Sequence, residues 1–256
     1  MTRSRVLIVG ATHGNERVGV RVINALRPLV EGNNDVDFLV ANPRALEANR
    51  RFLETDLNRS FPGNPQGAFE ERLAYDLQPL IASYNVVVDI HSTSSGLKSA
   101  VIVKKVSDET ISLVQCTNAK YVLHMDTNQG KALISGAKVG IAFEYGADNE
   151  PETEAETFNG ICLILQHLGH LRKTNAKSTK RKVFFHVSSV ILKPEGFLPL
   201  RTVKNYKVVV RGQPYAMHTV TGEVLVADEN FYPILFGENS YKDIFGFRGY
   251  RVSKLE

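Results

Sequence analysis

The sequence predicts an α/β protein, in which a mixed, mostly parallel sheet with flanking helices is followed by a small β-rich C-terminal domain. Three observations predict this fold class. Continuous apolar runs recur through the first two-thirds of the chain, helical patterns lie between or after several of them, and the helical patterns stop after a basic run at residues 172–182. Strands that alternate with helices are typical of folds in which helices cover a largely parallel sheet.

Six apolar runs are predicted to be strands of this sheet. Their Val, Ile and Leu residues follow one another without alternating polar residues, as in strands whose two faces are both buried. These runs are Val6–Val9, Val36–Val40, Val86–Ile90, Ala100–Val103, Tyr121–Leu123 and Val139–Phe143.

Four segments show the apolar spacing of helices, and we expect them to flank the sheet. They are Val18–Leu26, which ends before Pro28, and Phe69–Ile81, Glu109–Val114 and Glu152–Leu171. Residues 61–67 are rich in Pro, Gly and Asn. This composition predicts a surface loop.

The chain after the basic run has a different character. Short β-type segments with Gly and Pro between them replace the helical patterns, at Val183–Leu192, Tyr206–Val210, Glu223–Val226 and Tyr232–Phe236. We therefore predict two domains, residues 1–172 and residues 183–256, with the basic run as their junction.

Composition restricts the class of protein. Of 256 residues, 43% are hydrophobic and 23% are charged, which is typical of a soluble globular protein. No apolar stretch reaches the roughly 18 residues of a membrane span, and the first residues lead into a strand without the pattern of a signal peptide. Cys116 and Cys162 are far apart, which fits a reducing compartment, so we expect a cytoplasmic protein.

The basic run accounts for the positive charge of the chain. Without its six cations the formal charge of +4 becomes −2. We interpret the run as a solvated linker, with a patch that contacts nucleic acid or acidic lipid as the alternative. No aromatic residue interrupts the run, which argues against nucleic acid as a partner.

The turn after the first predicted strand reads Gly-Ala-Thr-His-Gly-Asn-Glu and contains His13 and Glu16. It lacks the Gly-Lys-Ser/Thr of a phosphate loop and the GxGxxG of a dinucleotide site. A helix cap would explain Glu16 but not His13. A metal site uses both residues, because zinc accepts imidazole and carboxylate ligands.

A third ligand follows another predicted strand. His91 ends the run that starts at Val86, and the carboxyl ends of parallel strands meet at one edge of a sheet. The sequence therefore predicts a metal site made by His13, Glu16 and His91. Asp89 lies two residues earlier on the same strand face, where a carboxylate can orient the imidazole.

Two further segments offer polar groups for this edge. Arg51, Asn58 and Arg59 are either a solvated face or a site for a substrate carboxylate, which a guanidinium binds in bidentate fashion. Glu144 ends an apolar strand, where it is either a residue that simply reaches the surface or a general base beside the metal.

Together these segments resemble the aspartoacylase/succinylglutamate desuccinylase family, which has a zinc carboxypeptidase-like fold. The matching segments are Gly10–Glu16, Asn42–Ala45, Arg51–Arg59, Asp89–His91 and Glu144–Gly146, in the order of the family motifs.

The resemblance implies one zinc ion per chain, held by His13, Glu16 and His91. It implies that Glu144 is the general base and then the proton donor, and that Arg51 stabilises the oxyanion. It further implies that Asn58, Arg59 and Tyr241 bind the substrate, an N-acyl amino acid. A family arginine before the catalytic glutamate is missing here, and Lys131 and Lys138 are the cations in its place.

We therefore expect a zinc-dependent amidohydrolase that cleaves an N-acylated, acidic amino acid into a carboxylate and a free amino acid. Two alternatives stay open. One is a metallocarboxypeptidase acting on a short peptide or peptidoglycan fragment, and the other is a catalytically idle binding protein of the same fold. The sequence leaves the oligomeric state undetermined.

Overall fold

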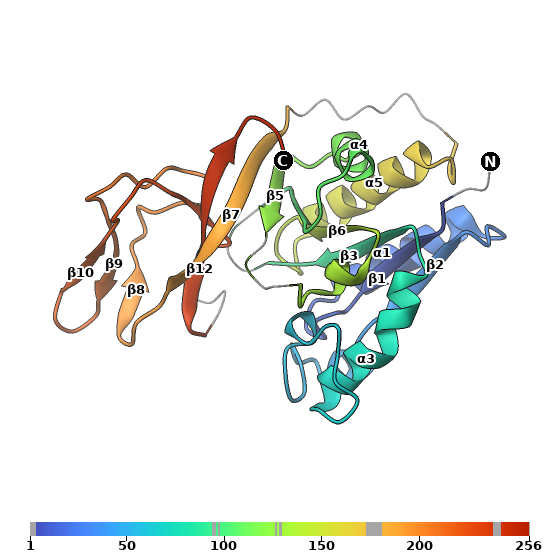
Figure 1. Ribbon diagram of the computed structural model, residues 1–256, viewed down its shortest axis with the longest axis horizontal. Helices are drawn as coiled ribbons and strands as arrows, with labels where there is room; N and C mark the ends of the chain where they lie inside the picture. The colour runs from blue at the N-terminus through green and yellow to red at the C-terminus, as the bar shows by residue number, and fades with distance from the viewer. Residues whose placement is uncertain are drawn as a thin grey trace.

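The computed structural model describes residues 4–93, 96, 98–125, 127, 130–172, 181–237 and 242–255. Its centre is a nine-stranded sheet (Figure 1). The strands are β1 (Val6–Gly10), β2 (Val36–Val40), β3 (Val86–His91), β4 (Ala100–Val103), β5 (Tyr121–Met125), β6 (Val139–Glu144), β7 (Val183–Leu192), β11 (Tyr232–Ile234) and β12 (Ile244–Val252). Their order is β11-β12-β7-β5-β4-β6-β3-β1-β2.

The strand directions determine where a site can form. Strands β2, β1, β3 and β6 are parallel neighbours, so β1, β3 and β6 end at the same edge of the sheet. Strand β4 is antiparallel to β6 but parallel to β5, which in turn is parallel to β7. The sheet is therefore mixed and mostly parallel, as predicted.

Helices cover both faces of the sheet (Figure 1). Helices α1 (Val18–Leu26), α4 (Asp108–Cys116) and α5 (Pro151–His167) share one apolar core with the β3 residue Val88. Helix α3 (Phe69–Ala82) contributes Ala74 and Ile81 to the core on the opposite face. The shorter helices are α2 (Pro43–Glu47), η1 (Arg27–Val30), η2 (Leu57–Arg59) and η3 (Leu133–Gly136).

The six predicted strands and four predicted helices are present near their expected positions. Helix α5 ends at His167 rather than at Leu171, and Gly169 follows with a left-handed φ of 82°. Residues 61–67 form neither helix nor strand, as expected. The expected strand over residues 206–210 is absent, since only Val209 forms a bridge, to Phe231.

The C-terminal part is β-rich, but the main sheet crosses the predicted domain boundary. Strand β7 pairs with β5, and β12 and β11 continue the sheet from β7. Within the described part of the chain, β8 (Phe197–Pro199), β9 (Pro214–His218) and β10 (Val224–Val226) form a separate antiparallel sheet. Whether residues 1–172 and 183–256 fold independently stays a prediction, while the main sheet contains strands from both.

The basic run lies mostly outside the described residues, which omit 173–180. Among the helices that are described, none is both long and apolar enough to span a bilayer.

Candidate active site

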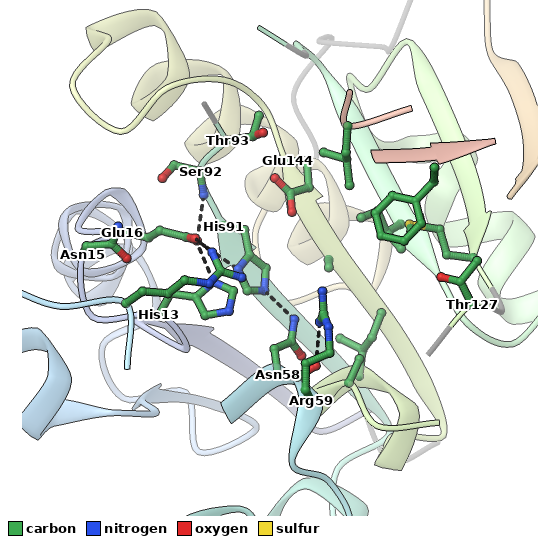
Figure 2. Close-up of a pocket in the computed structure, with 18 of the residues that line it drawn as sticks. His13, Asn15, Glu16, Asn58, Arg59, His91, Ser92, Thr93, Thr127 and Glu144 are labelled. Atoms are coloured by element: carbon green, nitrogen blue, oxygen red, sulfur yellow. Dashed lines mark hydrogen bonds and ion pairs between the residues drawn. The ribbon is translucent and has the colours of Figure 1, made fainter. Parts of the chain in front are cut away.

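The site lies where β1, β3 and β6 end. The loop after β1 contains His13 and Glu16, β3 ends at His91, and β6 ends at Glu144. In the sheet register His91 is directly opposite Glu144. Three segments that are far apart in sequence therefore bring their polar side chains to one edge (Figure 2).

The loop after β1 is held by close backbone contacts. Ala11 has a left-handed φ of 54°, and the amide of Gly14 donates to the carbonyl of Arg51 at 3.1 Å. A Cβ on Gly14 would lie 2.1 Å from the carbonyl carbon of Ala45. A side chain cannot fit at residue 14, so glycine lets this loop approach α2 and fixes the position of His13.

The three predicted metal ligands converge. The Nδ1 atom of His13 lies 2.7 Å from Oε1 of Glu16, and the Nδ1 atom of His91 lies 2.9 Å from Oε2 of the same carboxylate. One donor atom of each residue lies within 4.8 Å of those of the other two, and all three side chains are buried. This cluster is a potential metal-binding site.

The other ring nitrogen, Nε2, of each of the two histidines contacts a different carboxylate. Asp89 lies 2.8 Å from Nε2 of His91 and accepts a hydrogen bond from the Thr12 hydroxyl at 2.7 Å. Asp56 lies 3.1 Å from Nε2 of His13. Since each Nε2 faces a carboxylate, each imidazole directs Nδ1 into the cluster, which is the usual arrangement around a metal-ligating histidine.

The charges of the cluster support one another. Burial would raise the pKa of Glu16, but His13 and His91 hold it well below its ordinary value. Burial would lower the pKa of His91, but Asp89 and Glu16 raise it well above its ordinary value. The site thus places buried anionic oxygens around the imidazoles, an environment that also stabilises a cation.

The donor set fits a divalent transition metal. Two imidazole nitrogens and one carboxylate are the protein ligands of many catalytic zinc sites. His13, Glu16 and His91 all line the cavity, so a metal held by them would be accessible to a substrate there.

Glu144 lies across from this cluster (Figure 2). Its Oε2 atom is buried and has no hydrogen-bond partner among the described residues. Burial raises the pKa of Glu144 to about 7, against the lowering effect of His91. A carboxyl group with a pKa near neutrality can both accept and return a proton.

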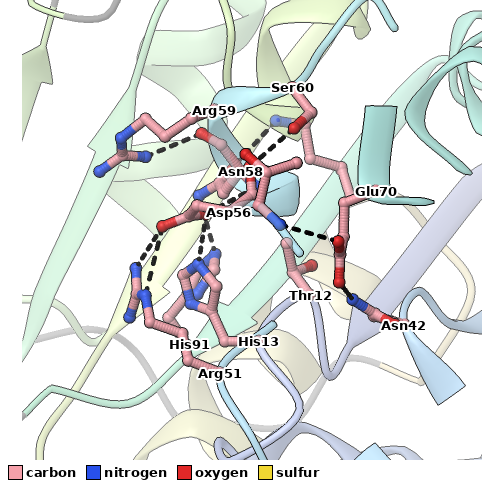
Figure 3. Close-up of polar contacts among 12 residues, drawn as sticks. Thr12, His13, Asn42, Arg51, Asp56, Asn58, Arg59, Ser60, Glu70 and His91 are labelled. Carbon is pink, nitrogen blue, oxygen red and sulfur yellow. Dashed lines mark hydrogen bonds and ion pairs between the residues drawn. The ribbon is translucent and has the colours of Figure 1, made fainter. Parts of the chain in front are cut away.

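Arg51 contacts the metal cluster through two acids. Its Nε and Nη2 atoms donate to Oδ2 of Asp56 at 3.2 and 3.0 Å (Figure 3). Its Nη1 atom donates to Glu16 at 3.3 Å. Burial would raise the pKa of Asp56, but His13, Arg51 and Arg59 hold it well below its ordinary value. Asp56 was not assigned a role from sequence. Its signals in the sequence are its place in a segment that matches the family motifs and its position between arginines.

Two of the predicted substrate residues, Asn58 and Arg59, also line the cavity. The side-chain oxygen of Asn58 accepts from the Leu133 amide at 2.8 Å, and Nη1 of Arg59 donates to the Asn58 carbonyl at 2.7 Å. Lys131 lines the cavity, whereas Lys138 is exposed and does not. Tyr241, the remaining predicted substrate residue, lies outside the described residues.

The cavity has a volume of about 810 Å³ and two kinds of wall. The polar wall contains the metal cluster, Arg51, Asn58, Arg59 and Glu144. The other wall is largely apolar and is formed by strands of the main sheet, by η3 and by the C-terminal part of the chain, with Ile102, Met125, Ile134, Leu235, Ile244 and Phe247. The volume suits a small organic molecule.

Known proteins resemble this chain in both sequence and structure. A probable aspartoacylase of Acaryochloris marina is 31% identical over 196 residues, which cover 67% of this chain and 65% of that protein. A probable aspartoacylase of Prochlorococcus marinus is 23% identical over 275 residues, which cover 95% of this chain and 92% of that protein.

Solved structures share the fold. The crystal structure of murine aminoacylase 3 matches with a TM-score of 0.79 at 18% identity, over 98% of this chain and 96% of that one. A succinylglutamate desuccinylase/aspartoacylase from Rhodobacter sphaeroides matches with a TM-score of 0.77 at 18% identity, over 99% and 87% of the two chains.

The family profile described as the succinylglutamate desuccinylase/aspartoacylase catalytic domain matches residues 2–159. This range includes the metal cluster, Arg51, Asn58, Arg59 and Glu144. The resemblance found in the sequence is confirmed, and the chain belongs to the succinylglutamate desuccinylase/aspartoacylase family.

Proposed function

We propose that the chain is a zinc-dependent amidohydrolase that cleaves an N-acyl amino acid. In this reaction the amide C–N bond breaks, the oxygen of a water molecule joins the acyl carbon, and the nitrogen leaves as an amine. The products are a carboxylate and a free amino acid. The aspartoacylase and desuccinylase names of its relatives support this class of substrate.

One observation carries the proposal: Glu144 presents a buried, unpartnered carboxylate oxygen beside a His-Glu-His cluster. His13, Glu16 and His91 would hold one zinc ion, which supplies Lewis-acid chemistry by lowering the pKa of water and polarising a carbonyl group. Glu144 takes a proton from the attacking water and returns it to the leaving nitrogen. Its pKa near 7 suits both transfers.

The cations of the polar wall hold the substrate. Arg51, oriented by Asp56, stabilises the negative charge that develops on the carbonyl oxygen. Asn58 and Arg59 hold the substrate carboxylate. Asp89 and Asp56 keep the two imidazoles in the orientation that the metal requires.

A substrate panel tests this proposal. The protein is loaded with zinc, its metal content is measured, and the release of free amine is followed with acetyl-, formyl- and succinyl-amino acids and with short peptides. The amino acids include acidic ones, which Lys131 and Arg59 would favour, and apolar ones, which the apolar wall would favour.

We expect about one zinc ion per chain and hydrolysis of N-acyl amino acids that a chelator abolishes and zinc restores. His13→Ala and His91→Ala variants should lose the metal. Turnover of peptides alone would replace the proposal with a metallocarboxypeptidase, and metal binding without turnover of any compound would point to an idle binding protein.

A further inference from the structure

Glu70 is a buried carboxylate to which the proposed reaction assigns no part. It is the second residue of α3, and its exposed fraction is 0%. A charged group so completely buried needs several hydrogen bonds to offset the loss of hydration. Among the described residues Glu70 accepts four hydrogen bonds. Three come from the loop at residues 51–56, and the fourth comes from Asn42, which lies between β2 and α2 (Figure 3).

Three of these hydrogen bonds come from consecutive backbone amides. The Leu53 amide donates to Oε1 at 2.6 Å, and the Glu54 and Thr55 amides donate to Oε2 at 3.1 and 3.0 Å. Residues 51–56 form neither helix nor strand, so no regular structure fixes this segment. The carboxylate of Glu70 takes the place of that structure, as an anion does in a backbone nest.

The two ends of this segment are the residues that contact the metal cluster. Arg51 lies at its start and Asp56 at its end, and they are bonded to each other and to Glu16 and His13, respectively. Whatever fixes the backbone of residues 53–55 therefore fixes the spacing of Arg51 and Asp56.

The fourth hydrogen bond extends this support to the loop after β1. The side-chain amide of Asn42 donates to Oε1 of Glu70 at 3.2 Å, and the backbone amide of Asn42 donates to the carbonyl of Ala11 at 3.0 Å. Asn42 is itself fully buried and caps α2 through the Ala45 amide. Glu70 thus connects both loops that supply the metal site.

We propose that Glu70 is a positioning residue, whose ionised carboxylate holds the 51–56 loop so that Arg51 faces the cavity and Asp56 contacts His13. The part of this inference that concerns turnover rests on the proposed amidohydrolase function. The part that concerns His13 and the metal does not.

The role requires a carboxylate, not only a side chain of this size. Both oxygens of Glu70 accept two hydrogen bonds each. A glutamine has the same shape, but its amide nitrogen would meet two donors instead of accepting from them. Buried donors without an acceptor are costly. We therefore expect the loop, which carries these amides, to move away from the glutamine.

Glu70→Gln is the test, with Glu71→Gln as the matched control. Glu71 is the next residue of the same helix, and its carboxylate accepts from the Ala68 amide at the helix start, not from the 51–56 loop. Zinc affinity is measured by competition with a chelator. We expect it to fall about 10-fold or more in Glu70→Gln, as for loss of other groups that orient a metal ligand, and to stay unchanged in Glu71→Gln.

Kinetics separate positioning from a general loss of structure. We expect kcat to fall about 100-fold with a smaller change in KM, because Arg51 acts on the developing oxyanion while Asn58 and Arg59 hold the substrate. In an Arg51→Ala background the additional effect of Glu70→Gln on kcat should be much smaller. A purely structural role would give the same factor in both backgrounds.

Asn42→Asp is a second variant in case Glu70→Gln does not fold. It keeps an oxygen to cap α2 but replaces the donor to Glu70 with a carboxylate, and we expect the same pattern. Unchanged zinc affinity in a folded variant would overturn the inference. The same would follow if the variant lowered kcat by the same factor in the unsubstituted chain and in the Arg51→Ala background. A zinc affinity that falls while no compound is hydrolysed would contradict the amidohydrolase proposal alone.

Discussion

Two properties of Glu144 disfavour its ionised form. Its pKa is raised to about 7 because the group is buried, and its Oε2 atom has no partner among the described residues to offset the loss of hydration. A buried acid without partners destabilises the folded chain. Such a group is more easily explained by a role in proton transfer than by a role in folding.

Glu144→Gln should retain the metal and lose hydrolysis. The amide has a similar shape but cannot accept a proton from water, so we expect kcat to fall about 100- to 10,000-fold. Zinc content, measured on the same preparation, is the control, because His13, Glu16 and His91 are unchanged. Activity near that of the unsubstituted chain would remove Glu144 from the mechanism.

The same group predicts how the unsubstituted enzyme depends on pH. A general base works only when deprotonated, so kcat/KM should decrease as the pH falls through the pKa of Glu144. That pKa is about 7 in the absence of a metal, and a bound cation lowers it, so the acid limb should lie at or below about pH 7. A profile that rises toward acid would contradict this assignment.

The sequence partly predicted which residues meet in the active-site cavity. His13, Glu16 and His91 could be placed together because parallel strands share an edge. Asp56 and Glu70 could not be assigned roles, because their partners depend on the course of the 51–56 loop, which has no regular structure. A buried acid in a loop or a first helical turn has the same sequence signature as a solvated one.

Among the elements, buried strands were the most predictable and β12 the least. Strand β12 contains two glycines and two arginines, and its pairing with β7 shifts register between Ile244 and Gly246 and between Arg248 and Gly249. These bulges break the alternation by which a strand is recognised in sequence. The expected strand at residues 206–210 has the composition of a strand, but only Val209 pairs.

The loop between β1 and α1 depends on a close approach of the backbone at Gly14 to α2. In Gly14→Ala the new Cβ would overlap the backbone of Ala45, so the loop must shift away from α2. We expect a loss of about 1–3 kcal/mol in the free energy of unfolding and weaker zinc binding. Denaturant unfolding checks this, with the exposed neighbour Asn15→Ala as the control for stability. Equal stability in both variants would contradict the packing argument.

For the whole molecule, the main sheet unites the two predicted domains. Residues of β7 and β12 belong to the same apolar core as α3, and Leu235, Ile244 and Phe247 also line the cavity. A chain shortened to residues 1–172 would therefore expose the edge of β5 and lose the part of the apolar cavity wall that Leu235, Ile244 and Phe247 form. Exposed edges and apolar faces promote aggregation.

We therefore expect the 1–172 fragment to be insoluble or aggregated and to lack hydrolase activity, while the full chain is soluble under the same conditions. Solubility after expression and zinc content of any soluble fraction are the measurements. A soluble fragment that binds zinc would instead establish residues 1–172 as an independent domain.

The carboxylate of Asp56 is shared between His13 and Arg51, and we therefore expect zinc and the substrate to bind cooperatively. Because such coupling is reciprocal, an acid that binds Arg51 must strengthen zinc binding by the same factor by which zinc strengthens binding of the acid. Zinc affinity measured with and without the carboxylate product gives this factor. In Asp56→Asn this coupling factor should be closer to one, even if zinc and the carboxylate product both still bind.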